Sequence, residues 1–221
     1  MKYVLLIISL LLFQTSQAQP VIKPHVVKKT KRFKIANNCY FDKYWYEVVL
    51  PNKKAADSIN NRVHKIFTKD YFTPSPDDCC DPQNEYSYDC EVACITTSFF
   101  SLIVHENNFY KGAQHGYTTF STLNFNTTTG KMLSFSNMVL PEKKAALDSI
   151  MLQRLAMRYR CAGPCPFSEF TTEQLQHLDF KIEKNSGLVI LFHMENFGAE
   201  IEQPWSFEEL ESFMKPEYLG Y

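Results

Sequence analysis

Side chains of alternating character over residues 32–50 constrain this chain more than any other feature. One side of the clearest stretch carries Tyr40, Asp42, Tyr44, Tyr46 and Val48, and the other carries Phe41, Lys43, Trp45, Glu47 and Val49. A period of two residues places neighbouring side chains on opposite faces, as in a β-strand. We therefore predict a strand over 32–50 that ends at Pro51, because proline has no backbone N–H to give to a sheet.

A helix is predicted after Pro51, and the same pattern recurs after Pro141. Each helix has one apolar stripe, which is typical of a helix that lies on a sheet. The stripes are Ala56, Ile59, Val63, Ile66 and Phe67, and then Leu147, Ile150, Met151, Leu155 and Tyr159. Residues 140–150 also echo residues 50–59 closely. Either two related strand-proline-helix lobes are present, or both segments independently use proline, alanine and lysine as good helix starters.

The rest of the chain predicts more strands than helices. Residues 91–106 are apolar on both faces and predict one long central strand, with 117–126 as its antiparallel neighbour. A turn at 127–130 leads to a predicted strand over 131–135, and 180–192 predicts a hairpin about Asn185-Ser186-Gly187. Capping pairs predict a short helix at Thr171 and Gln174 and a final helix at Ser206 and Glu209. The predicted class is α+β, with a mainly antiparallel sheet, two strand-proline-helix lobes and a C-terminal helix.

Residues 1–18 predict a secretory signal peptide. Lys2 precedes an apolar run over 4–13, and Ser16-Gln17-Ala18 places small residues where a signal peptidase cuts. The run is too short for a helix that spans a membrane, which needs about 20 residues. We expect a secreted or periplasmic protein with no transmembrane anchor after signal cleavage. Its first segment, residues 19–31, is rich in lysine and predicts a solvated basic arm.

The composition indicates a packed globular protein. The chain has 18 Phe and 12 Tyr but only 7 Gly, and a mature chain of about 200 residues buries roughly 70% of its unfolded surface. A formal net charge of −1 argues against a nucleic-acid partner, since such a partner requires a broad basic face.

All the cysteines lie in the part that is expected to be exported: Cys39, Cys79, Cys80, Cys90, Cys94, Cys161 and Cys165. An oxidising compartment pairs such residues, so three disulfides and one odd thiol are predicted. Gly163 and Pro164 favour a turn that brings Cys161 and Cys165 together as a local bridge. The other pairings stay open.

Residues 70–90 show no periodicity and predict a long loop held by its cysteines. Long connections without secondary structure are uncommon and often bind ligands. The acidic residues Asp77, Asp78 and Asp81 lack the regular ligand spacing and the glycine of a calcium-binding loop. We therefore expect them to recognise a partner and not a metal ion.

Several short motifs follow one another from Tyr40 to the C-terminus. They are Ser58-Ile59-Asn60, Gly112-Ala113-Gln114-His115-Gly116, Leu123-Asn124-Phe125-Asn126, Thr129-Gly130-Lys131, Leu133-Ser134-Phe135 and Phe197-Gly198. By these motifs the chain resembles an exported two-part family, the DUF4163 and DUF3298 domains, with residues 32–106 as the first part and 107–221 as the second. The family pattern is Gly-Gly-Ala-His, whereas Ala113 and Gln114 fill its second and third places here. Asn126 stands where an aspartate is common in the family.

The resemblance implies a binding role in the cell envelope. Members of this family resemble the exported part of a lysozyme-sensing anti-sigma factor and the accessory region of peptidoglycan deacetylases. The expected partner is a lysozyme-like protein or a peptidoglycan fragment, and a basic lysozyme suits the acidic loop electrostatically. The expected binding residues are Gly112, Gln114, His115, Gly116, Asp77, Asp78 and Asp81. His115 is the functional residue that the resemblance carries over.

Catalysis is the alternative hypothesis. His115 lies between two glycines, where an imidazole is free to transfer protons or bind a metal. Glu195, Glu200 and Glu202 near His193 are candidates for the paired carboxylates of a glycoside hydrolase, and Tyr44-Trp45-Tyr46 for a sugar-stacking surface. The sequence has no nucleophile elbow, phosphate loop or dinucleotide fingerprint. We expect a binding domain without cofactor or metal, and the alternative is an envelope glycan or peptide hydrolase that uses His115.

Overall fold

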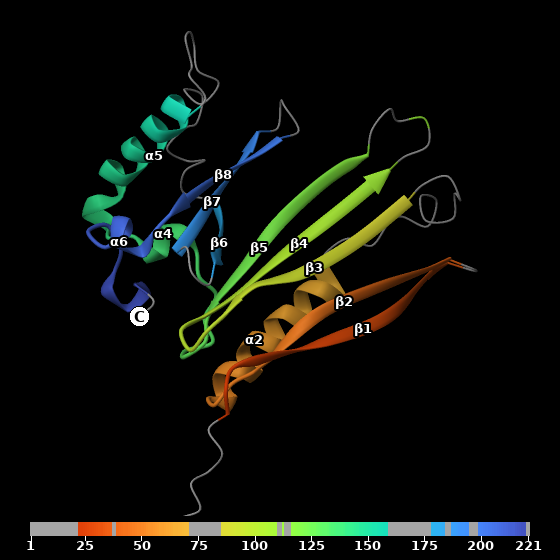
Figure 1. Cartoon of the computed structure of the whole chain (residues 1–221). Helices are drawn as coiled ribbons and strands as arrows, with labels where there is room; N and C mark the ends of the chain where they lie inside the picture. Colours follow the sequence, from red (N-terminus) through yellow and green to blue (C-terminus); the bar gives the residue numbers. More distant parts are fainter. Residues whose placement is uncertain are drawn as a thin grey trace, which may run out of the picture.

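The computed structural model describes residues 22–36, 39–70, 85–109, 112, 116–158, 178–183, 187–194 and 199–219 (Figure 1). The strands are β1 (His25–Ala36), β2 (Cys39–Val49), β3 (Glu85–Ile95), β4 (Phe99–Phe109), β5 (Tyr117–Asn126), β6 (Asp179–Glu183), β7 (Gly187–Met194) and β8 (Ala199–Trp205). The helices are α2 (Lys53–Lys65), α4 (Phe135–Met138), α5 (Lys144–Arg158) and α6 (Phe207–Leu210), with the short helical turns η1 (Ile66–Asp70), η2 (Pro141–Lys143) and η5 (Pro216–Tyr218). The named strands pair antiparallel, which confirms the predicted α+β class.

The alternating residues form β2, but β2 is one half of a hairpin. Its partner β1 runs antiparallel beside it, with His25 opposite Val49. The single strand predicted over 32–50 is therefore two strands, and residues 25–31 belong to β1 and not to a basic arm. The run of lysines suggested a solvated tail. An edge strand accommodates the same residues, because its outer side chains stay in water while its backbone pairs on one side.

Helix α2 follows β2 because Asn52 caps it. The Asn52 Oδ1 atom accepts a hydrogen bond from the backbone N–H of Ala55 at 3.2 Å, which satisfies one of the free donors of the first turn. Pro51 lies just before the cap. The predicted apolar stripe is confirmed, since Ala56, Ile59, Val63, Ile66 and Phe67 are all buried.

Residues 91–106 form parts of two strands, so the prediction of one long strand is wrong. β3 and β4 meet at a tight turn in which the Thr96 hydroxyl accepts the backbone N–H of Phe99 at 2.9 Å. The turn sequence Thr96-Thr97-Ser98 lacks the glycine, proline or asparagine that mark most turns. The expected pairing of residues 117–126 is confirmed, because β5 pairs antiparallel with β4.

Pro141 also precedes a helix, but no full strand leads to it. The strand predicted over 131–135 is replaced by a single bridge between Phe125 and Met132 and then by α4. The Ser134 hydroxyl accepts the backbone N–H of Asn137 at 3.3 Å and so begins α4 where alternation predicted a strand. The stripe of α5 is confirmed at Leu147, Met151 and Leu155, which are buried, and at Ile150, which is partly buried.

The hairpin predicted over 180–192 is confirmed as β6 and β7. Gly187 begins β7 with φ +98°, and a Cβ there would lie 2.2 Å from the Trp205 carbonyl oxygen, so no other residue fits. Ser206 and Glu209 form the predicted capping box, although the helix that it starts, α6, is only 4 residues long. The helix predicted at Thr171 and Gln174 lies outside the described residues.

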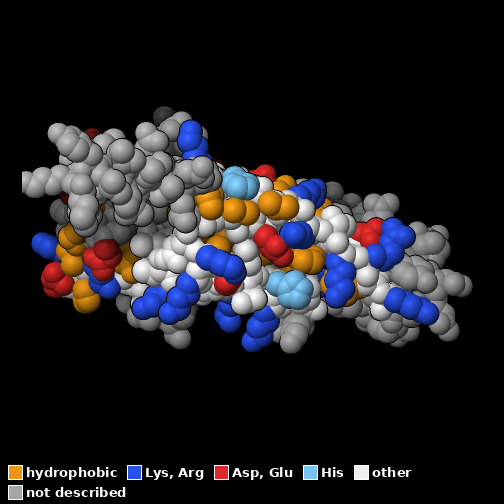
Figure 2. Space-filling view, turned by 90° about the horizontal axis from the view of Figure 1, so that it is seen from below, with side chains coloured by type: hydrophobic (Ala, Val, Ile, Leu, Met, Phe, Trp, Pro, Cys, Tyr) orange, Lys and Arg blue, Asp and Glu red, His pale blue; other side chains and the backbone are white. Residues whose placement is uncertain are grey.

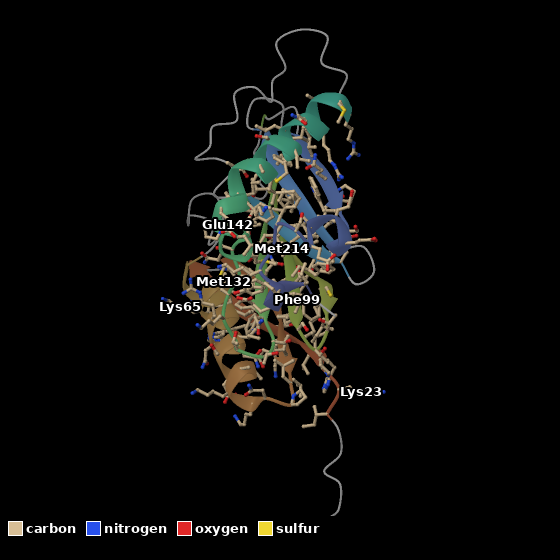
Figure 3. All side chains as sticks on the ribbon, turned by 90° about the vertical axis from the view of Figure 1, so that its left-hand side faces the viewer. Lys23, Lys65, Phe99, Met132, Glu142 and Met214 are labelled. Carbon is tan, nitrogen blue, oxygen red and sulfur yellow. The ribbon has the colours of Figure 1, made fainter. Side chains whose placement is uncertain are left out.

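Two hydrophobic cores lie on opposite faces of the β3–β4–β5 sheet. Alternate residues of β4 supply them, since Phe100 and Leu102 pack toward α2 and β2 while Phe99 packs toward β6–β8 and α5. Figure 1 shows α2 with the β1–β2 hairpin at one end of the molecule and β6–β8 with α4, α5 and α6 at the other. Figure 3 shows Phe99 and Met214, both in the core beside β6–β8 and α5, near the centre of the molecule.

Candidate functional site

Two of the predicted binding residues, Gly112 and Gly116, lie in the described part of the chain, and both are exposed. Gly112 has φ +84°, and nothing lies within 4 Å of the position that a Cβ would occupy. This glycine therefore serves a left-handed backbone and not a close approach. Gln114, His115, Asp77, Asp78 and Asp81 lie outside the described residues, so the binding and catalytic roles proposed for them stay predictions.

Of the three glutamates predicted as candidates for glycoside hydrolysis, Glu202 is the one whose side chain the structure describes. It is exposed, and its carboxylate accepts a hydrogen bond from Lys181 Nζ at 2.7 Å. Burial acts to lower the pKa of Lys181, but bonds to Glu202 and Glu183 outweigh burial and raise it. An exposed, ion-paired carboxylate is not in the apolar environment that tunes a general acid. Within the described ranges no three His, Cys, Asp or Glu side chains meet as metal ligands.

The motif Ser58-Ile59-Asn60 is structural at each position. The Ser58 hydroxyl donates to the Gly130 carbonyl at 3.1 Å, and Ile59 is fully buried in the core under α2. The side-chain oxygen of Asn60 accepts a hydrogen bond from the backbone N–H of Val48 at 2.8 Å, and its side-chain nitrogen donates to the Val48 carbonyl at 3.0 Å. Asn60 thus pairs with β2 as a neighbouring strand would, which fixes α2 against the hairpin.

The motif from Asn126 to Lys131 forms a turn that docks on α2. The Asn126 carboxamide oxygen accepts the backbone N–H groups of Thr128 and Thr129 at 3.0 and 2.8 Å, a side-chain turn that asparagine favours. Gly130 has φ +73°, and a Cβ there would lie 2.8 Å from the Ser58 Cβ, so the turn approaches the helix too closely for any larger residue. An asparagine suffices at position 126 because its side chain serves the turn.

Asn124 joins the β3–β4–β5 sheet to the β6–β7–β8 sheet. It is 2% exposed, accepts the Ser101 hydroxyl at 2.7 Å and donates to the Phe180 carbonyl at 2.5 Å. The backbone N–H groups of Phe180 and Ile182 donate in turn to the hydroxyls of Thr122 and Ser101, at 3.3 and 3.2 Å. Side chains of β4 and β5 thereby satisfy the outer edge of β6. The family-like motifs that the structure describes therefore hold the fold together.

Of the seven cysteines, Cys90 and Cys94 have described side chains, and both are buried. A bulge between Val92 and Cys94 changes the face of β3, so Cys90 lies in the core beside α2 and Cys94 in the core beside β6–β8. The two sulfurs therefore do not face each other. The predicted disulfides, including the bridge between Cys161 and Cys165, stay predictions.

The aromatic cluster of β2 is divided between the two faces of the hairpin. Trp45 is 5% exposed and packs edge-on against His64, with ring centroids 5.5 Å apart, and beside Phe67. It is a core residue and does not stack on a sugar. Tyr44 and Tyr46 lie on the opposite face, where they are half-buried and pack against the same core.

These tyrosines share their face with cations of β1. We call Lys28, Arg32, Lys34, Tyr44 and Tyr46 the basic face. The Lys28 ammonium lies 3.7 Å from the centroid of the Tyr44 ring, a cation–π contact that holds the charge in place. Arg32 donates to both carboxylate oxygens of Asp42, at 2.8 and 2.7 Å. These hydrogen bonds, helped by the charge of Arg32, lower the pKa of Asp42.

Cations also lie on the reverse side of the hairpin. Lys29 pairs with Glu47 at 3.5 Å, and Lys31 lies over the Phe33 ring, 4.9 Å from its centroid. Lys43 is 2% exposed; burial lowers its pKa, and the nearby Glu106 carboxylate acts in the opposite direction. Figure 2 views the molecule from below Figure 1, where β1 and β2 lie, and shows Lys and Arg side chains spread over this side.

The basic face was missed by sequence reasoning because β1 was interpreted as a solvated arm. A usable signal was present, since Val26, Val27, Thr30 and Ile35 are β-branched residues that favour strands and are set among the lysines. The run of lysines conceals this strand preference, because like charges close together favour a solvated, unpaired segment. Only the pairing with β2 shows that the charges are held in a regular row.

Comparison with protein-family models and with curated protein sequences gives no match. Among the described residues no helix is both long and apolar enough to cross a membrane.

Two solved structures share the fold. A DUF3298 family protein from Pseudomonas aeruginosa has a TM-score of 0.57 at 14% identity, over 92% of this chain and 98% of that one. A DUF3298 family member from Bacteroides fragilis has a TM-score of 0.58 at 12% identity, over 88% of this chain and 94% of that one. At such low identity the likeness concerns the fold alone. The chain therefore has the fold of DUF3298 proteins.

Proposed function

We propose that this protein is an exported, disulfide-containing binding domain of the cell envelope, secreted or periplasmic, that recognises a peptidoglycan-related glycan. In this proposal residues 32–106 correspond to the DUF4163-like part and 107–221 to the DUF3298-like part. The role is binding without catalysis. A lysozyme-like protein that binds the acidic stretch around Asp77, Asp78 and Asp81 is the other expected partner, and it forms a separate arm of the test.

The observation that carries the proposal is the pair of half-buried tyrosines beside ordered cations on the basic face. Tyrosine gives a large, stiff contact surface with an apolar ring and a polar tip, at low cost in conformational entropy. Lys28 occupies one side of the Tyr44 ring, so Tyr46 and the edge of Tyr44 are the surfaces that meet a sugar. A surface with both aromatic and cationic groups suits a glycan that carries carboxylates.

Binding of the folded, oxidised protein to insoluble peptidoglycan, followed by calorimetry with soluble fragments, tests the proposal. We expect Tyr46→Ala to weaken binding by about fivefold to tenfold, since one aromatic contact contributes about 1 kcal/mol. Tyr218→Ala is the matched control, because Tyr218 is also half-buried but lies on η5 at the other end of the chain. Thermal unfolding of both variants separates a loss of contact from a loss of fold.

The proposal is wrong if the folded protein binds neither peptidoglycan nor its fragments, or if Tyr218→Ala weakens binding as much as Tyr46→Ala. In a parallel arm, lysozyme replaces the glycan. If the protein binds lysozyme, if Tyr46→Ala leaves that binding unchanged, and if peptidoglycan does not bind, the ligand is a protein and not a glycan.

A further inference from the structure

We propose that the basic face binds a linear polyanion that lies along β1. This inference rests on the proposed function, because it assigns the chemical class of the ligand that meets the same face. It predicts a chain of carboxylates or phosphates and not a single small anion, since the cations form an extended row and do not converge on one point.

The row follows from the geometry of the strand. Lys28, Arg32 and Lys34 occupy even positions of β1 and therefore share one face. Each residue of a strand advances by about 3.3 Å, so the first and last charges of the row are about 20 Å apart. That span exceeds the reach of one small anion. A polymer with regularly spaced charges meets all of the row at once.

The charged side chains of β1 are all of one sign. The strand carries five cations, Lys28, Lys29, Lys31, Arg32 and Lys34, and no carboxylate. The whole chain has a net charge of −1, so the remaining residues together carry −6. Charges of both signs would protect an edge strand from aggregation equally well, so solubility alone does not require charges of one sign. A one-signed strand on an otherwise acidic chain creates a local field that attracts polyanions.

Part of this charge is not neutralised within the hairpin. Arg32 pairs with Asp42 and Lys29 with Glu47. In the described part of the chain no carboxylate lies within salt-bridge distance of Lys23, Lys28, Lys31 or Lys34. Of these described side chains, Lys28 lies over the Tyr44 ring and Lys31 over the Phe33 ring of its own strand. Lys23, which precedes β1, points away from the molecule in Figure 3. Lys28 is ordered by Tyr44, so a ligand meets at least one fixed charge.

Two pairs of substitutions on the same strand separate the two faces. Lys28→Gln with Lys34→Gln removes two charges from the basic face, and Lys29→Gln with Lys31→Gln removes two from the reverse face. Lys54→Gln with Lys143→Gln removes two exposed charges from helical segments far from β1 along the chain. All three double variants change the net charge equally, so a difference between them reports position and not bulk charge.

The experiment measures binding of the full mature protein to fluorescent polygalacturonate, to inorganic polyphosphate and to a neutral chitin oligosaccharide, at low and at high salt. We expect both polyanions to bind at low salt and to dissociate at high salt. The Lys28/Lys34 variant should bind about tenfold more weakly, and the other two variants within about threefold of wild type, because each exposed ion pair contributes up to about a factor of five. Tighter binding of polygalacturonate assigns a carboxylate polymer, and tighter binding of polyphosphate a phosphate polymer.

No binding to either polyanion at low salt would overturn the inference, as would equal weakening by all three double variants. If peptidoglycan binding is unchanged by salt and by the lysine substitutions, the polyanion inference is overturned while the proposed function stands. Polyanion binding that depends on Lys28 and Lys34, without any binding to peptidoglycan, would support the inference and refute the proposed function.

Discussion

Replacement of Asn124 by alanine tests whether side chains of β4 and β5 hold the β6–β7–β8 sheet in place. Asn124 is 2% exposed, and its carboxamide lies between the Ser101 hydroxyl and the Phe180 carbonyl. Alanine removes both of these hydrogen bonds and a longer one from the carboxamide to Thr122 Oγ1 at 3.4 Å, and it leaves no polar atom to replace them. The edge of β6 then faces the β3–β4–β5 sheet with an unsatisfied carbonyl group.

The expected loss follows from the Ser101 hydroxyl and the Phe180 carbonyl, because Thr122 Oγ1 keeps the backbone N–H of Phe180 as a donor. A buried polar atom left without a hydrogen bond costs about 1–3 kcal/mol. The Ser101 hydroxyl still accepts the N–H of Ile182, so its loss lies at the low end of that range, whereas the Phe180 carbonyl loses its donor at 2.5 Å. We expect the free energy of unfolding to fall by about 3 kcal/mol. For a chain of this size the Tm should fall by about 6–12 °C.

Chemical denaturation and thermal unfolding, both under non-reducing conditions, measure this change. Asn137→Ala is the control, because Asn137 is exposed on α4 and its substitution should change stability by less than about 0.5 kcal/mol. If Asn124→Ala unfolds within about 0.5 kcal/mol of the wild type, the side chains that join the sheets contribute no net stability and the argument is refuted.

Three further substitutions test local parts of the fold. Gly130→Ala should cost more than about 2 kcal/mol, since strain from the positive φ adds to a clash with α2, whereas Gly112→Ala meets open space and should cost only the strain of about 1–2 kcal/mol; equal losses in urea denaturation would contradict the clash. Asn60→Ala removes both bonds to the β2 backbone and should cost about 2 kcal/mol by the same assay, and a loss near zero would contradict its strand-like role. Hydrogen bonds from Arg154 and the α6 cap lower the pKa of Glu209 in the folded state, so the pair stabilises the fold above the unfolded pKa and loses this effect as the pH falls through the folded pKa. Glu209→Gln should therefore lower stability at neutral pH, by less than about 1 kcal/mol, and match wild type in acid; a difference that persists in acid would contradict this origin.

Local patterns predicted most helices and strands but missed the turn between β3 and β4 and the short helix α4. The stripe of α2 and the capping box at Ser206 were predicted because they depend on neighbours three or four residues away. The division of residues 91–106 was not predicted, because the turn is made through the Thr96 hydroxyl and contains no glycine, proline or asparagine. The short helix α4 was missed for a related reason, since the Ser134 cap competes with an alternating pattern.

The candidate site was less predictable than the fold. The glycines and the histidine at 112–116 predicted a binding site by their residue types, and the described members of that segment make no contact that identifies a ligand. The basic face depends on two strands and their register. Lys28 and Tyr44 are 16 residues apart in the sequence but adjacent in space, so no local pattern predicts their contact.

The sequence by itself determined the α+β class, the amphipathic helices and the alternation of β2, because periodicity and capping are local properties of the chain. Tertiary structure alone decided what the motif residues do. Asn60, Asn124 and Gly130 act through partners far away in the sequence, and their close approach exists only after the sheets and α2 have packed. It also decided that the lysines of β1 lie in a row along a strand, since backbone pairing with β2 overcomes the repulsion that would keep such a segment free.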